Sequence, residues 1–132
     1  MARRAFQLPE ADRNFLDTTY PLLWETVVEG QTQWVILDEF KMPTGYNHEK
    51  VAVALRIAPT YPATEIDMAY FKPDLARADG NPIGALTPLQ IDNQTWQQWS
   101  RHRPSNAWRP DIDNIESHLM YVRAFLEGEL KK

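Results

Sequence analysis

The sequence predicts an α+β domain in which a short N-terminal helix, an antiparallel meander of four strands and a C-terminal helix follow one another. Three observations support this class. Four short segments rich in β-branched and aromatic residues are joined by short loops, which favours antiparallel neighbours. Apolar residues recur at helical spacing near the C-terminus. The length of 132 residues suits a single domain over residues 1–132, with residues 1–8 as a flexible arm.

The first helix is expected at residues 9–17. Pro9 suits the first turn of a helix, and the carboxylates of Glu10 and Asp12 favour its positive N-terminal end. The pair Tyr20–Pro21 then ends the helix, because the residue before a proline avoids the helical conformation.

The strands follow from the period-two pattern, and an irregular stretch separates them from the last helix. Strands are expected at residues 24–30, 33–40, 50–57 and 66–71. Proline and glycine break the pattern over residues 72–94, which predicts a long irregular loop of the kind that often carries function. Residues 93–99 are expected to form a short helical turn.

The last helix is expected from Asp111 to about residue 130, with Pro110 at its start. One side of it is apolar at helical spacing. The residues on that side are Ile112, Ile115, Leu119, Val122, Phe125 and Leu126.

The composition excludes several classes of protein. A net charge of −4 argues against a general nucleic-acid binder. No apolar run reaches the roughly 18 residues of a membrane span, and no signal peptide is visible, so we expect a cytoplasmic protein. The absence of cysteine excludes disulfides, thiolate metal sites and thiol catalysis. The three histidines lack the spacing of a metal site, and we expect no metal or other cofactor.

The stretch from Trp96 to Pro110, W-Q-Q-W-S-R-H-R-P-S-N-A-W-R-P, is the candidate functional segment. It holds three of the five tryptophans, and Arg101, His102 and Arg103 make it locally basic in an acidic chain. Large tryptophan rings indicate a buried or half-buried platform.

Two short motifs give the chain a family resemblance. Pro59-Thr60-Tyr61-Pro62 resembles the P-x-x-Y-P turn of ubiquitin-conjugating enzymes, and Trp108-Arg109-Pro110 resembles their W-S-P element. Together with the order of the elements, they make residues 8–126 similar to the bacterial ubiquitin-conjugating-like proteins called prokaryotic family E. The resemblance implies the ubiquitin-conjugating fold with an irregular active-site loop.

The resemblance implies a site at Ser100. In the family a catalytic cysteine stands eight residues before the tryptophan of W-x-P, and counting back from Trp108 gives Ser100. The His-Pro-Asn element of the family has no clean match. Three interpretations stay open: Ser100 is a native nucleophile that carries the modifier as an oxyester, it replaces a cysteine by engineering, or the protein only binds.

A serine nucleophile needs a nearby base, and His102 is the candidate. Arg101, Arg103 or backbone N–H groups are candidates to stabilise the oxyanion. Asp111 is best explained as a helix N-terminal charge, although acidic residues here help activate the incoming amine in the family. The alternatives to these catalytic roles are structural: Ser100 is an ordinary polar residue, His102 bonds a backbone carbonyl, and the tryptophans belong to the core.

The resemblance also implies the partners, which are a ubiquitin-like protein, an adenylating activating enzyme and a target protein. The activating enzyme docks in the superfamily mainly on the first helix, where Arg13, Phe15 and Leu16 are the candidates. A role in phage defence is suggested by the family's operons alone. The alternatives are an inactive binding module of the same fold and a small hydrolase built on Ser100 and His102, for which no acidic residue is obviously placed and no G-x-S-x-G elbow exists.

Overall fold

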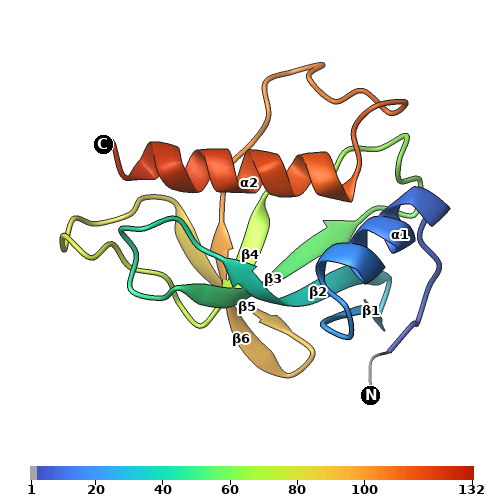
Figure 1. Cartoon of the computed structure of the whole chain (residues 1–132), viewed down its shortest axis with the longest axis horizontal. Helices are drawn as coiled ribbons and strands as arrows, with labels where there is room; N and C mark the ends of the chain where they lie inside the picture. The colour runs from blue at the N-terminus through green and yellow to red at the C-terminus, as the bar shows by residue number, and fades with distance from the viewer. Residues whose placement is uncertain (1–2) are drawn as a thin grey trace.

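The computed structural model describes residues 3–132 and has the predicted α+β class (Figure 1). One helix lies near each end of the chain, and the strands of the sheet come between the two helices in sequence. The elements are α1 (Glu10–Thr19), β1 (Trp24–Glu29), β2 (Thr32–Lys41), β3 (Lys50–Ile57), β4 (Ala69–Lys72), β5 (Leu86–Ile91), β6 (Gln94–Trp99) and α2 (Ile115–Glu129). Neither helix of these residues combines the length and apolarity needed to cross a bilayer.

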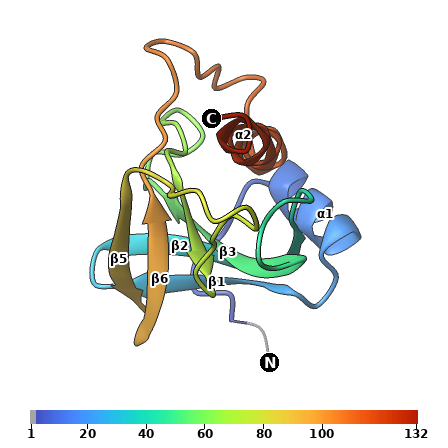
Figure 2. The same cartoon turned by 90° about the vertical axis from the view of Figure 1, so that its left-hand side faces the viewer.

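All six strands form one antiparallel sheet in the order β1-β2-β3-β4-β6-β5. The predicted meander of four strands is confirmed as β1 to β4, but the strand count of four is wrong. Figure 2 shows that β5 and β6 run at a steep angle to β1 and β2, so the sheet is strongly curved.

The two missed strands form a hairpin where a loop and a short helical turn were expected. Its turn is Asp92–Asn93, with φ of 53° and 61°. Two successive positive φ values are the geometry of a type I′ turn, which matches the twist of paired strands. Pro88 lies inside β5, and the sheet tolerates it because β5 is an edge strand.

The main core lies between the sheet and the helices, and α2 crosses one face of the sheet (Figure 1). Val35 and Leu37 of β2 point into this core, whereas Trp34 and Ile36 point to the opposite face, as strand alternation requires. That face holds a smaller apolar cluster that includes Tyr70. Trp96 also belongs to this smaller cluster.

The segment before α1 is the one expected to be a flexible arm over residues 1–8. Met1 and Ala2 lie outside the described residues. From Arg3 onward the chain follows β1, with Ala5 N–H donating to the Thr26 carbonyl at 3.1 Å and Thr26 N–H donating to the Arg3 carbonyl at 3.0 Å.

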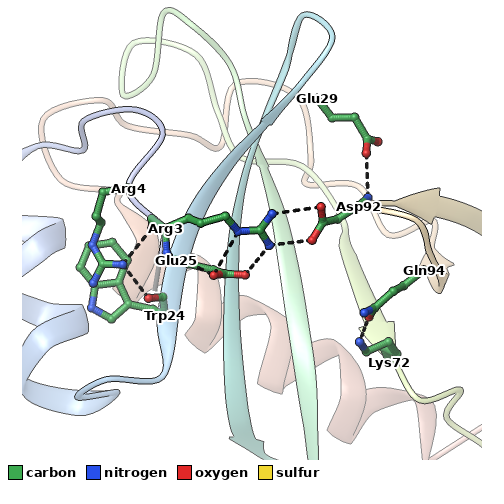
Figure 3. A network of polar contacts seen from close by, with 8 residues as sticks. All are labelled: Arg3, Arg4, Trp24, Glu25, Glu29, Lys72, Asp92 and Gln94. Atoms are coloured by element: carbon green, nitrogen blue, oxygen red, sulfur yellow. Dashed lines mark hydrogen bonds and ion pairs between the residues drawn. The ribbon is translucent and has the colours of Figure 1, made fainter. Parts of the chain in front are cut away.

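Arg3 also joins the first strand to the β5–β6 turn, which lies at the other side of the sheet (Figure 3). Its Nη2 lies 2.7 Å from the Glu25 carboxylate and 2.6 Å from the Asp92 carboxylate. The backbone N–H of Asp92 donates to the Glu29 carboxylate at 2.8 Å. These contacts hold the two ends of the curved sheet near each other.

The C-terminal helix begins later than expected, at Ile115 and not at Asp111. Asn114 is its N-cap, and Ser117 completes a capping box: each side chain accepts a hydrogen bond from the other residue's backbone N–H, at 3.0 and 2.9 Å. This reciprocal cap satisfies N–H groups that a start at Asp111 would leave without an equally good partner. Pro110, Asp111 and Ile112 form a turn instead, and Asp113 and the cap residue Asn114 follow it.

Candidate functional site

Ser100 is the first residue after β6 and is half-buried. Its backbone N–H donates to the Ala85 carbonyl at 3.1 Å, which extends the β5–β6 pairing by one residue. The preceding Trp99 is fully buried, and its ring stacks on Phe125 of α2 at 5.9 Å between centroids. Ser100 is therefore fixed in position by the strand and by the core on which the strand rests.

Gln98 is the side chain that contacts the Ser100 hydroxyl. Its Nε2 donates to Ser100 Oγ at 3.3 Å. The two residues are two apart at the end of one strand, so their side chains leave the same face. Sequence reasoning did not single out Gln98, although this spacing on a strand is a readable signal once β6 is known.

His102 pairs with Asp67, which sequence reasoning did not find. His102 Nδ1 lies 2.9 and 3.1 Å from the two oxygens of the Asp67 carboxylate. Asp67 precedes β4 and lies thirty-five positions before His102 in the chain, so no local motif indicates the pair. Within residues 3–132, no hydrogen bond joins His102 to Ser100.

A surface pocket of about 250 Å³ adjoins this pair on the Asp67 side. Glu65 and Asp67 contribute carboxylates to it, and Met68 and Pro59 contribute apolar surface. It opens beside the end of β3 and the start of β4.

Arg101 is held in structural contacts. Its Nη2 lies 3.0 Å from Glu129 Oε1 and donates to the Gly84 carbonyl at 3.1 Å, while Nη1 donates to the Ser100 carbonyl at 3.0 Å. Glu129 is only 4% exposed. This arginine neutralises a buried carboxylate and ties the segment to the end of α2, so the arrangement does not favour the expected oxyanion role.

Arg103 is also held in structural contacts. Its guanidinium lies over the rings of Trp108 and Tyr121, 5.1 and 4.5 Å from their centroids, and Nη2 donates to His118 Nδ1 at 2.9 Å. His118 is fully buried, and its Nε2–H donates to the Met68 carbonyl at 2.8 Å. Burial, together with the nearby Arg103 charge, lowers the pKa of His118 to about 4. His118 is therefore neutral and structural.

The two family motifs meet in space. Trp108 Nε1 donates to the Pro62 carbonyl at 2.8 Å, and the Trp108 ring lies 6.2 Å from that of Tyr61. The Tyr61 hydroxyl donates to Asp12 of α1 at 2.8 Å. Burial and the Asp12 hydrogen bond raise the pKa of Tyr61, so it remains a donor at neutral pH. These contacts fix the far end of the segment that begins at Ser100.

The other expected residues lie away from Ser100. Asp111 is exposed in the turn before α2, and it is Asp113 that accepts the Arg109 backbone N–H at 2.8 Å. On α1, Arg13 is exposed and Phe15 is half-buried, but Leu16 is fully buried in the core. Leu16 therefore offers no surface to a partner.

Across residues 3–132, no three histidine, aspartate or glutamate side chains converge in the manner of a metal site. No curated protein and no solved structure matches the chain. The family model described as prokaryotic E2 family E matches residues 8–129, which is nearly the whole chain and includes both motifs and Ser100. The chain therefore belongs to prokaryotic E2 family E, a family of proteins that resemble ubiquitin-conjugating enzymes.

Proposed function

We propose that this protein is a carrier that accepts a bacterial ubiquitin-like protein from an activating enzyme as an oxyester on Ser100 and transfers it to a target protein. The observation that carries the proposal is the place of Ser100: half-buried directly after β6, eight residues before Trp108, whose indole contacts the Tyr61–Pro62 turn. This is the position that the family resemblance gives to the acyl-carrying residue.

The loading step is an acyl transfer. Ser100 Oγ attacks the activated C-terminal carbonyl of the ubiquitin-like protein, the bond from that carbonyl to the activating enzyme breaks, and the hydroxyl proton leaves with a base. The Gln98 amide, 3.3 Å from Oγ, is placed to donate to the oxyanion of the tetrahedral intermediate. The carrier itself needs no metal or nucleotide for this step.

Docking of the activating enzyme is proposed on α1. Arg13 is exposed there, and the half-buried Phe15 packs edge-on against Tyr20 at 6.3 Å between ring centroids. These two side chains offer a charge and an apolar surface, which Leu16 does not because it is buried.

The test is a loading assay with the activating enzyme and ubiquitin-like protein of the same organism and ATP, read by denaturing gel and mass spectrometry. We expect an adduct that resists thiol, yields to mild base and disappears in Ser100→Ala. Ser105→Ala is the matched control, because Ser105 is an exposed serine of the same segment.

Other outcomes identify the alternatives. An adduct formed only by Ser100→Cys would indicate that the serine replaces a cysteine. No adduct in any variant, with partner binding intact, would favour an inactive binding module.

A serine hydrolase is the second candidate, and one observation favours it: the acidic partner missing from the sequence interpretation is Asp67, 2.9 Å from His102. Against it stands the lack of a Ser100–His102 hydrogen bond in residues 3–132. Hydrolysis of p-nitrophenyl acetate by the protein alone, lost in Ser100→Ala, would support the hydrolase.

A further inference from the structure

His102 and Asp67 form an exposed pair, and His102 is two residues from Ser100 in the sequence. The imidazole side chain is 64% exposed and the Asp67 side chain 39% exposed, and Nδ1 lies 2.9 Å from the nearer carboxylate oxygen. The pair belongs neither to the core nor to the contacts that hold the segment. Buried His118, by contrast, has partners on both ring nitrogens.

The pairing sets the chemical state of the ring. An ionised carboxylate only accepts hydrogen bonds, so His102 Nδ1 must carry a proton. In the neutral ring, Nε2 then bears the lone pair and is the basic atom. Asp67 thus holds the imidazole in the tautomer in which the opposite nitrogen can take a proton, and it stabilises the imidazolium that forms.

The position of His102 relative to Ser100 indicates which proton it takes. The two residues are two apart, so their Cα atoms are at most about 7 Å from each other. The Ser100 hydroxyl already has Gln98 as its contact, and His102 has Asp67. Among residues 3–132 no hydrogen bond occupies His102 Nε2, so this nitrogen can accept a proton from a nucleophile that approaches the ester on Ser100.

We propose that His102 is the general base of the discharge step and that Asp67 is its positioning residue. The inference rests on the proposed carrier function. The acceptor nitrogen or oxygen attacks the ester carbonyl on Ser100 and gives its proton to His102 Nε2. The carbonyl–Oγ bond breaks, the proton passes from Nε2 to the departing Ser100 oxygen, and the products are the acylated acceptor and the free serine.

The test follows discharge of the preformed adduct. Loading is taken to completion, ATP is removed with apyrase, and the loss of adduct is timed with free L-lysine as the probe nucleophile. We expect His102→Ala to slow discharge about a hundredfold or more, in line with the usual contribution of general base catalysis. Added imidazole restores part of this rate, because it supplies the missing base. Asp67→Asn is also slowed, and Asp67→Glu recovers part of the loss.

Three controls separate this role from a structural one. Hydroxylamine attacks esters with little need of a base, so its discharge rate changes far less in His102→Ala than the lysine rate. His48→Ala removes a histidine from the loop between β2 and β3, and Glu65→Gln removes the other carboxylate of the pocket. Neither is expected to slow discharge onto lysine.

The outcomes distinguish the two proposals. An adduct that discharges at the wild-type rate in both His102→Ala and Asp67→Asn overturns this inference and leaves the carrier intact. Variants that never accumulate adduct would place the pair on the loading step and also overturn it. Slow discharge that imidazole does not restore would assign His102 a structural role. No adduct in the wild type overturns the carrier and this inference together.

Discussion

The Asp12 carboxylate accepts the backbone N–H of Ile115 at 3.1 Å, so a side chain of the first helix caps the beginning of the last one. The other carboxylate oxygen accepts the Tyr61 hydroxyl at 2.8 Å. Asp12 is only 2% exposed. One buried carboxylate therefore joins α1, the Tyr-Pro turn and the N-terminus of α2, three parts that flank the candidate site.

Replacing Asp12 by alanine is expected to cost about 3 kcal/mol of unfolding free energy, because a buried N–H and a buried hydroxyl lose their acceptor. Asp12→Asn keeps one carbonyl oxygen and should cost less. Urea denaturation monitored by tryptophan fluorescence measures both. Equal losses in the two variants would contradict the assignment of the cost to hydrogen bonding.

His118 makes the stability depend on pH. Its pKa is lowered to about 4 in the folded protein from an ordinary value of 6.5, because burial disfavours the charged ring. The unfolded chain therefore binds the proton more tightly, and this contribution to stability is present above pH 6.5 and is lost as the pH falls towards 4. Between pH 7 and pH 5 the loss from this residue is about 2 kcal/mol.

The measurement compares urea unfolding of the wild type and His118→Gln at both pH values. The variant is expected to be less stable at pH 7, since glutamine fits the site poorly, but to lose less stability on acidification. The same pH dependence in both proteins would show that other groups are responsible.

Removing Arg101 should act on stability. Arg101→Ala leaves the Glu129 carboxylate buried without its main partner, which is expected to cost about 3 kcal/mol. The double variant Arg101→Ala/Glu129→Ala should recover part of that loss, because no unpaired charge remains. Thermal denaturation of the single and double variants checks this coupling.

An oxyanion role for Arg101 would give a different result. Under conditions in which Arg101→Ala is fully folded, we expect its loading rate to be within a few-fold of the wild type. A loading defect of a hundredfold or more in the folded variant would assign Arg101 a role in stabilising the oxyanion.

Arg3 should contribute little despite its two short ion pairs. Its side chain is 48% exposed, and exposed ion pairs are screened by water and salt. Arg3→Ala is expected to lose about 1 kcal/mol or less, and the difference from the wild type should shrink between 50 mM and 500 mM NaCl. A larger, salt-independent loss would mean that the arginine supports the packing of residues 3–8 on β1.

The parts of the fold that sequence predicted are those with a strong local pattern. Residues 50–57 are a short, nearly continuous apolar run and form β3 over the expected range, and the apolar side of α2 does pack on the sheet. The β5–β6 hairpin was missed because Pro88 and the polar residues of both strands hide the pattern. Their pairing with each other and with β4 outweighs these weak propensities.

The residues of the candidate site also differ in whether their evidence lies in the sequence or only in the fold. Ser100 could be singled out as a candidate because its evidence is a spacing to Trp108, which is read along the chain. Asp67 was missed because its evidence is a contact that exists only after β4 pairs with β6 and brings it beside His102. The contacts of Arg101 and Arg103 could not be predicted for the same reason, since their partners Glu129 and His118 lie on α2.

Both outer edges of the sheet carry a feature that hinders the addition of a further strand. Along β5, Pro88 presents no N–H, and along β1, residues 3–5 occupy hydrogen-bonding groups that would otherwise face solvent. Exposed strand edges invite chains to join and aggregate. For the proposed carrier, which would meet and release other proteins repeatedly, this arrangement leaves the encounters to side chains and loops, so that they do not become permanent through sheet extension.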